Sequence, residues 1–184
     1  MKKLRVERPD GQTLVVRELC AGDVQALQQY HAGLSPETRA VFTPHAYDDA
    51  TVARMIARAV DGTDLACVAL AGREIVAYFF LWNMVDPVPS LGIGITDRYQ
   101  HKGLGVQFMK MLIAGASAAK RDGVELTTVL TNARAFALYQ KVGFQYVEDV
   151  DNIAGDGRVM RERWMFLPLK PGAKPIRREH RPPV

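Results

Sequence analysis

The residues best suited to chemistry begin with a short turn, Gln100-His-Lys-Gly-Leu-Gly105, which follows an apolar strand pattern and precedes a long helical pattern. A turn that enters a helix presents free backbone N–H groups at the positive end of the helix dipole, where a pyrophosphate can bind. Gly103 and Gly105 allow the backbone to approach such a ligand closely. Short Gly-x-Gly turns also serve as plain connections between a strand and a helix, so both interpretations stand at this point.

The same turn disfavours a Rossmann dinucleotide-binding fold. That fold needs Gly-x-Gly-x-x-Gly in a βαβ unit, with an acidic ribose ligand about 20 residues further on. Here Phe108 occupies the position of the third glycine, and three or four predicted strands precede the turn.

A second candidate is Tyr139, which lies seven residues after Asn132 on a predicted helix over 133–142. A phenol with a pKa of about 10 stays protonated at neutral pH and can donate a proton to a group that becomes negative. The alternative is a core aromatic residue whose hydroxyl finds a partner. Asn132 directly precedes Ala133 and is typical of a helix N-cap.

Three segments of the second half occur in a fixed order: Ile93-Gly94-Ile95, then Gln100 to Gly105, then Asn132 followed by Ala137-Leu-Tyr-Gln-Lys-Val-Gly-Phe144. Together they resemble the GNAT superfamily of acyl-CoA-dependent N-acetyltransferases, whose turn signature is Gln/Arg-x-x-Gly-x-Gly/Ala. The specific resemblance covers residues 91–146. It implies acetyl-CoA as co-substrate, an amine as acceptor and no metal.

The resemblance also implies a role for each segment. The strand over 90–96 splays from its neighbour, so the backbone of Ile93 and Ile95 pairs with the pantetheine arm, and a backbone N–H stabilises the oxyanion. Tyr139 protonates the departing CoA thiolate, and Asn132 hydrogen-bonds the pantetheine region, a role compatible with N-capping. The implied cofactor-binding residues are Ile93, Gly94, Ile95, Gln100, His101, Lys102, Gly103, Leu104, Gly105, Val106 and Asn132.

The strand over 90–96 has a second interpretation, because Gly92 and Gly94 interrupt it. Glycine in a strand marks a bulge or a close backbone approach. A locally irregular strand with no ligand would therefore show the same pattern.

The general base is left unassigned. Many relatives place a Glu on one of the two splayed strands, but here Thr127 stands five residues before Asn132, and the strand over 90–96 has no carboxylate. A water chain, or an amine that arrives neutral, would need no dedicated base. The other candidates are Glu125, His45, Glu74 and Asp86.

The loop over 42–47 lies in a region that lines the acceptor site in the resembled family, which makes Phe42 and His45 candidate substrate contacts. The alternative is a packing loop with His45 as a satisfied surface residue. His101 is expected to contact phosphate or solvent, and no role is expected for His31 or His180. A small molecule is the expected acceptor, and its identity is not encoded in any motif.

The hydrophobic periodicities predict the element order βααβββαβαββ. With the resemblance, this order implies a single-domain α/β (α+β) fold over 1–169, in which helices flank a mixed, mostly antiparallel sheet. The predicted strands cover 12–19, 65–71, 74–82, 90–96, 125–131, 144–150 and 158–167. The predicted helices cover 23–33, 48–62 and 133–142, with a short helical turn at 35–37 and a long helix that follows the turn over 100–105 and ends at Arg121.

The composition is that of an ordinary globular protein, with 48% hydrophobic and 24% charged residues among 184, which excludes disordered, fibrous and collagen-like classes. Cys20 and Cys67 are too few for a disulfide framework and are expected to be buried and reduced. The apolar stretch over 65–85 is interrupted by Gly72-Arg73-Glu74 and predicts a hairpin, since a spanning helix needs about 20 apolar residues. The N-terminus lacks the pattern of a secretory signal, which makes the cytoplasm the expected compartment.

The basic charge is concentrated in residues 170–184, where five basic residues and one acidic residue account for the whole formal net charge of +4. Four prolines and few apolar residues accompany them, which predicts a disordered extension. The body is then neutral, so nucleic acid binding, which only the tail could provide, is disfavoured. The expected function is an acetyl-CoA-dependent N-acetyltransferase, and the alternative is a non-catalytic acyl-CoA-binding module that regulates a partner. A homodimer is the commonest oligomer and is compatible with the sequence.

Overall fold

One twisted sheet organises the chain, and the computed structural model describes it over residues 3–8, 11–100 and 103–184. Within these residues the strand order is β1-β2-β3-β4-β5-β6-β8-β7, and every neighbouring pair is antiparallel except β5 and β6. The mixed, mostly antiparallel sheet is therefore confirmed. The strands are β1 (Leu4–Glu7), β2 (Thr13–Glu18), β3 (Leu65–Ala71), β4 (Glu74–Trp82), β5 (Ser90–Ile95), β6 (Gly123–Val129), β7 (Gln145–Ile153) and β8 (Val159–Pro168).

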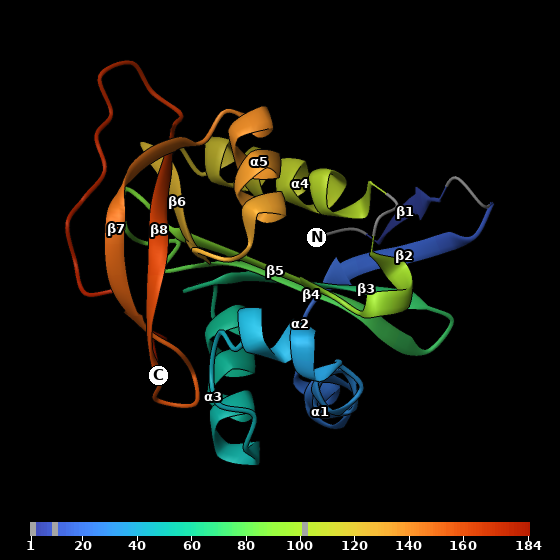
Figure 1. Cartoon of the computed structure of the whole chain (residues 1–184). Coiled ribbons are helices and arrows are strands. Elements are labelled where there is room, and N and C mark those ends of the chain that lie inside the picture. The colour runs from blue at the N-terminus through green and yellow to red at the C-terminus, as the bar shows by residue number, and fades with distance from the viewer. Residues whose placement is uncertain (1–2, 9–10, 101–102) are drawn as a thin grey trace.

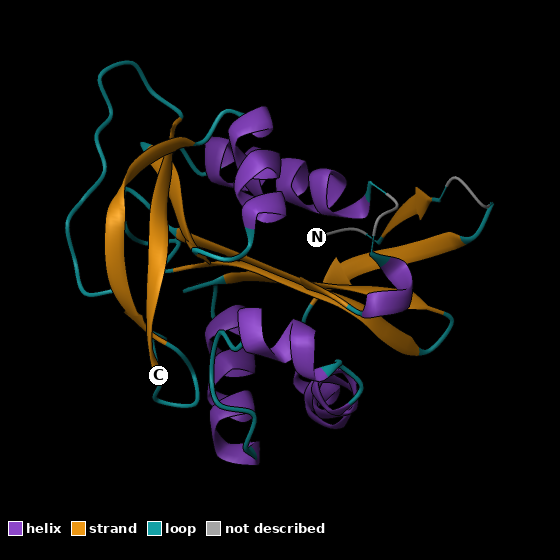
Figure 2. Cartoon of the chain, in the orientation of Figure 1, coloured by secondary structure: helices purple, strands orange, loops and turns teal. Residues whose placement is uncertain are grey.

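Helices cover both faces of this sheet (Figures 1 and 2). On one face lie α1 (Val24–Ala32), α2 (Pro36–Val41) and α3 (Asp49–Val60), and on the other lie α4 (Leu104–Ala118) and α5 (Ala133–Val142). Two short 3-10 helices, η1 (Ala21–Asp23) and η2 (Asp97–Tyr99), precede α1 and the loop before α4. No helix in the described part of the chain has the length and apolar character needed to cross a membrane.

Each face of the sheet has its own apolar core, because successive residues of a strand point to opposite faces. Phe79 on β4 stacks on Phe108 of α4, with ring centroids 4.4 Å apart. Phe80, the next residue, packs on the opposite face with the side chains of α1 and α3. This two-sided burial explains the unbroken apolar run of β4.

The elements predicted most accurately are those specified by turns, caps and periodicity within a few adjacent residues. The bounds of β3, β4 and α5 agree with the sequence prediction, and Asn132 caps α5 as expected by accepting a hydrogen bond from Ala135 N at 3.1 Å. Strand β1 was not predicted, and α2 is longer than the single turn expected. Cys67 is buried as predicted, but Cys20 is exposed, and both are free thiols.

Residues 170–184 follow a defined path in the structure, which differs from the disordered extension predicted. The segment loops out beyond β7 and returns, so that the C-terminus lies near the β7–β8 hairpin (Figure 1). Lys170 Nζ lies 2.6 Å from Asp122 Oδ1, and Arg177 Nη1 lies 2.6 Å from Glu148 Oε1. Composition alone does not reveal these partners, because their carboxylates belong to distant parts of the sequence.

Candidate active site

A cleft of ≈870 Å³ opens where β5 and β6 separate. Ser90 and Glu125 form the parallel pair that joins the two strands, and the described residues beyond this pair are not paired with each other. Residues Leu91 to Ile95 line the cleft, together with the first turn of α4 and one side of α5. A strand that lacks a neighbour presents a row of N–H and C=O groups to whatever occupies the opening. The splay predicted for this strand is thus present.

The first turn of α4 forms one end of the cleft. Gly103 caps this helix with a φ of +73°, a left-handed conformation that glycine adopts without strain. Gly105 also lines the cleft, and a Cβ built there would lie 3.7 Å from Leu138, an ordinary contact distance. The open N-terminus of a 15-residue helix is a suitable site for a pyrophosphate. Of the predicted cofactor-binding residues of this turn, Leu104 and Val106 line the cleft, whereas His101 and Lys102 lie outside the described residues.

Gln100 borders the cleft, but its side chain is engaged by the protein. Its Nε2 donates to the carbonyl oxygen of Ile95 at 3.0 Å and to Thr38 Oγ1 at 3.2 Å. The same Thr38 hydroxyl donates to Asp97 Oδ1 at 2.6 Å. Gln100 therefore ties the end of β5 to α2, which positions the turn.

Helix α5 supplies the wall opposite β5. Tyr139 lines the cleft on this helix, and burial raises the pKa of its hydroxyl to about 12. The phenol is therefore protonated at neutral pH and able to donate. Asn132 also lines the cleft while it caps the helix, so both of the roles considered for it are sterically compatible.

The glycines of β5 make room for aromatic side chains on the opposite face of the sheet. A Cβ at Gly92 would lie 2.2 Å from the Phe80 ring, and a Cβ at Gly94 would lie 2.3 Å from Phe42. The strand itself pairs with β4 in continuous register from Ala77–Ile95 to Trp82–Ser90. The strand is therefore regular, which contradicts the irregularity considered as an alternative, and the close approach of two aromatic rings explains both glycines.

A second, smaller cavity of ≈150 Å³ lies on that opposite face. It shares Leu91, Gly92 and Thr127 with the cleft, so the two cavities meet where β5 and β6 separate. Aromatic side chains and two buried carboxylates line it. Its principal lining side chains are Phe42, Phe80, Trp82, Glu125, Asn152 and Glu162.

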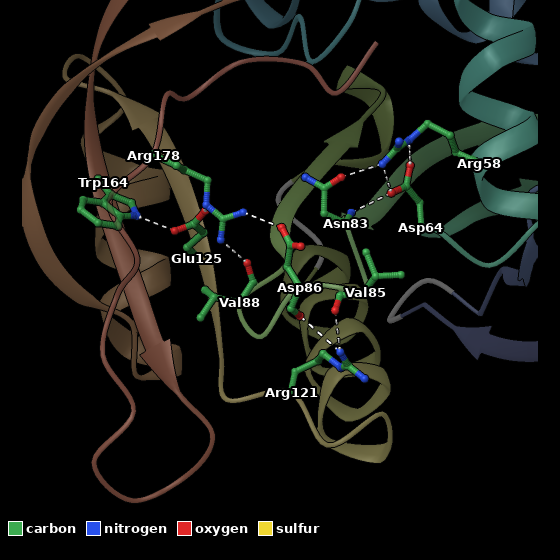
Figure 3. A network of polar contacts seen from close by, with 10 residues as sticks. All are labelled: Arg58, Asp64, Asn83, Val85, Asp86, Val88, Arg121, Glu125, Trp164 and Arg178. Carbon is green, nitrogen blue, oxygen red and sulfur yellow. Dashed lines mark hydrogen bonds and ion pairs between the residues drawn. The ribbon is translucent and has the colours of Figure 1, made fainter.

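The first of these carboxylates, Glu125, is held in a network of its own (Figure 3). Its side chain is 1% exposed, Trp164 Nε1 donates to Oε2 at 3.0 Å, and Arg178 Nε lies 3.1 Å from Oε1. Arg178 also donates to Asp86 Oδ2 at 2.9 Å and to the Val88 carbonyl oxygen at 2.7 Å. Burial raises the pKa of Glu125 to about 7, although Arg178 and Trp164 act in the opposite direction.

The second carboxylate, Glu162, is linked by hydrogen bonds to Asn152 and Thr127. Asn152 Nδ2 donates to Glu162 Oε2 at 3.0 Å and lies 3.4 Å from Thr127 Oγ1, on the strand that borders both cavities. Burial raises the pKa of Glu162, and hydrogen bonds from Thr127 and Asn152 partly oppose this rise. A buried carboxylate with a raised pKa beside a cavity is a candidate proton acceptor.

Comparison with known proteins agrees with this geometry. The acetyltransferase (GNAT) domain family matches residues 13–145. The chain belongs to the GNAT family. The L-amino acid N-acetyltransferase AaaT of Escherichia coli (strain K12) is 26% identical to this GNAT protein over 137 residues, which make up 72% of this chain and 83% of that protein.

Solved structures of GNAT proteins share its fold. The ribosomal-protein-S5-alanine acetyltransferase from Vibrio fischeri has a TM-score of 0.76 at 12% identity, covering 95% of this chain and 100% of that chain. The GNAT domain of S. lividans PAT has a TM-score of 0.73 at 16% identity, covering 91% and 97%. The yncA structure from Salmonella typhimurium, which contains its cofactor acetyl-CoA, has a TM-score of 0.66 at 16% identity, covering 89% and 98%. The GNAT resemblance and architecture predicted from the sequence are confirmed.

One of the two candidate substrate residues in the loop over 42–47 of this GNAT protein lines the cavities. Phe42 lies between the two cavities and lines both. His45 lines neither of them, because it is 0% exposed and packs against His31, Tyr47 and Tyr78. Its Nδ1 lies 2.7 Å from the Ala46 carbonyl oxygen, and burial lowers its pKa to about 4. The expectation that His45 contacts substrate is therefore wrong.

The β7–β8 hairpin covers this loop and explains the burial of His45. Gly155 N donates to the Thr43 carbonyl oxygen at 2.8 Å, and a Cβ at Gly155 would lie 2.0 Å from the His45 backbone. The contact depends on a residue more than 100 positions away, so the loop sequence alone could not reveal it.

Two other base candidates of this GNAT protein are also placed away from the junction. Glu74 is exposed, forms an ion pair with Arg98 and lines a separate cleft. Asp86 accepts a hydrogen bond from Arg178. Sequence reasoning missed Glu162 and Arg178. The position of Glu162 could have been predicted in part, since side chains alternate along a strand and Glu162 therefore lies on the same face as Trp164.

Proposed function

We propose that this GNAT protein transfers the acetyl group of acetyl-CoA to the nitrogen of a small amine by direct attack in a ternary complex. The observation that supports it best is the meeting of two cavities at Leu91, Gly92 and Thr127, with Tyr139 in one and Glu162 in the other. The E. coli relative named for acetylation of L-amino acids and the fold neighbour that contains acetyl-CoA support the same reaction.

The larger cleft fits acetyl-CoA, which supplies an activated thioester when bound. The backbone N–H groups of the first α4 turn, from Leu104 to Val106, would hold the pyrophosphate at a glycine-capped helix N-terminus. The unpaired edge of β5 at Ile93 and Ile95 would hydrogen-bond the pantetheine arm. A backbone N–H of the same strand would donate to the thioester oxygen as negative charge develops on it.

Two side chains would carry out the proton transfers. Glu162 takes a proton from the amine, with Asn152 and Thr127 fixing its carboxylate. Tyr139 donates its phenolic proton to the departing sulfur. The C–N bond forms first and places negative charge on the carbonyl oxygen; the C–S bond then breaks as the C=O bond is restored and the sulfur takes the proton of Tyr139. Glu125 is the less suitable base because Arg178 and Trp164 already contact its two oxygens.

Release of CoA thiol in the presence of a broad panel of amines tests this proposal. Tyr139→Phe is expected to lower kcat by roughly 10²–10⁴-fold, the usual range for a lost general acid, with the KM for acetyl-CoA little changed. Tyr146→Phe is the matched control, because Tyr146 is an exposed tyrosine on β7. Glu162→Gln is expected to remove the acidic limb of the pH profile of kcat/KM.

Full turnover by Tyr139→Phe would contradict the assignment of the acid. Binding of acetyl-CoA without CoA release for any amine would favour the non-catalytic acyl-CoA-binding module instead.

A further inference from the structure

The C-terminal segment over 176–182 lies against the smaller cavity and is anchored there by its backbone. Ile153 N, at the end of β7, donates to the His180 carbonyl oxygen at 2.9 Å, and Asn152 and His180 form a parallel bridge. His180 is 8% exposed as a residue, and its ring centroid lies 5.2 Å from that of Trp164. The segment is thus held at the edge of the sheet by both main-chain and side-chain contacts.

Arg178 fixes the same segment to the floor of the cavity (Figure 3). Its guanidinium reaches three groups from the body of the protein: Asp86, the carbonyl of Val88, and Glu125, which is buried. A buried carboxylate needs a partner of opposite charge or must take up a proton. Arg178 therefore compensates Glu125, and in doing so it places residues 179–182 across one side of the cavity.

Five consecutive residues of this segment, 178–182, line the cavity together with Phe42, Phe80 and Trp82. The cavity volume of ≈150 Å³ is about half the lower limit of typical ligand pockets, which is about 300 Å³. It has room for a small molecule that places its amine at the junction with the cleft. A polypeptide acceptor would have to pass the rest of its chain out between the lining residues, and residues 178–182 occupy part of that lining.

We propose that the C-terminal segment is a fixed wall of the acceptor site, and that it restricts this acetyltransferase to small free primary amines and excludes polypeptide N-termini. This inference rests on the proposed function. Within the cavity, the buried carboxylate Glu162 can accept a hydrogen bond from the amine of the acceptor, and Phe80 and Trp82 provide an apolar surface for a short side chain.

Pairs of acceptors that share the same α-amine test whether the C-terminal segment restricts the acceptor site. Each L-amino acid is compared with the tripeptide that begins with the same residue and continues with Gly-Gly, so that both present the same α-amine. The full-length protein is expected to show kcat/KM at least 10²-fold higher for the preferred free amino acid than for its tripeptide. A chain that ends at Lys174 is expected to reduce this ratio at least tenfold by raising the KM for the amino acid, with the KM for acetyl-CoA within twofold.

A second variant tests the same inference if the truncated chain misfolds. The double substitution Arg178→Gln with Glu125→Gln removes the ion pair without leaving a buried charge unpaired, and it is expected to shift the same ratio in the same direction. Thermal melting and acetyl-CoA binding report whether each variant folds.

Equal use of peptides and free amino acids by the full-length protein would overturn the inference, as would an unchanged ratio in both folded variants. Binding of the same acceptors to CoA-saturated protein, followed by the fluorescence of Trp82 at the cavity, tests the wall without turnover. Tenfold weaker binding of amino acids to the truncated chain supports it, and unchanged binding overturns it. Failure of the proposed function is distinguishable, because CoA release would then be absent with every acceptor.

Discussion

Two histidines in a buried aromatic cluster should make the folded protein sensitive to acid. Burial lowers the pKa of His31 to about 2 and that of His45 to about 4, from an ordinary value of 6.5. Both rings are then neutral in the folded chain at pH 5, whereas they are protonated in the unfolded chain. Because the unfolded state binds more protons below pH 6.5, the free energy of unfolding falls as the pH decreases from 6.5 toward 4.

The size of this effect follows from the two pKa values. For His45, the free energy of unfolding decreases by about 2 kcal/mol between pH 8 and pH 5, since each pKa unit corresponds to about 1.4 kcal/mol. His31 adds a similar loss. Glu125 acts in the opposite direction, because its raised pKa of about 7 lets the folded chain take up a proton before the unfolded chain does. The contribution of His45 must therefore be measured as a difference between variants.

Urea unfolding at pH 5, 6, 7 and 8, followed by circular dichroism, provides the measurement. In His45→Asn the amide replaces the Nδ1 atom that contacts the Ala46 carbonyl oxygen, and the titrating ring is lost. The decrease in unfolding free energy from pH 8 to pH 5 is expected to be about 2 kcal/mol smaller in this variant than in the wild type. Tyr47→Phe is the control: it removes the hydroxyl that donates to the Phe42 carbonyl oxygen at 3.3 Å, without removing a group that titrates in this range. Parallel pH curves for the wild type and His45→Asn would refute the reasoning.

Two further predictions concern the cleft. Asn132→Ala removes the cap of α5 and is expected to lower stability by about 1 kcal/mol, whereas Asn132→Ser retains a capping oxygen; thermal melting of the two variants checks this. Gly94→Ala places a methyl group 2.3 Å from Phe42, so the Phe42 ring must move. Because that ring lines the smaller cavity, the KM for the acceptor is expected to rise. An unchanged KM in steady-state kinetics would show that the ring can move without disturbing the acceptor site.

The parts of the site that the sequence predicted well are those specified by neighbouring residues. The turn that ends in Gly103 and Gly105 and the capped helix bearing Tyr139 depend on a few adjacent positions, and both line the cleft. The acceptor side depends instead on long-range contacts. Glu162 reaches the cavity through its place on β8, and His45 is buried by a hairpin far along the chain.

The C-terminal segment illustrates the same limit. Its charge and proline content favour disorder when it is considered alone. In the fold, Arg178 meets two carboxylates, Asp86 and Glu125, which lie more than 50 residues earlier in the chain. Composition describes the cost of ordering such a segment, whereas the contacts that offset this cost are determined by tertiary structure.

The single parallel pair between β5 and β6 divides the sheet into two blocks of strands that the ligand can join. A ligand with pantetheine-like amides would add hydrogen bonds along the open edge of β5 and bridge both blocks, acting as a removable strand. By thermodynamic linkage, occupancy of the cleft would then stabilise the whole fold by RT ln(1 + [L]/Kd). Amide hydrogens of Leu91 to Ile95 that face the opening would exchange slowly only while the cleft is filled. The two blocks of strands would then unfold as one unit when acetyl-CoA is bound and more independently when it is absent.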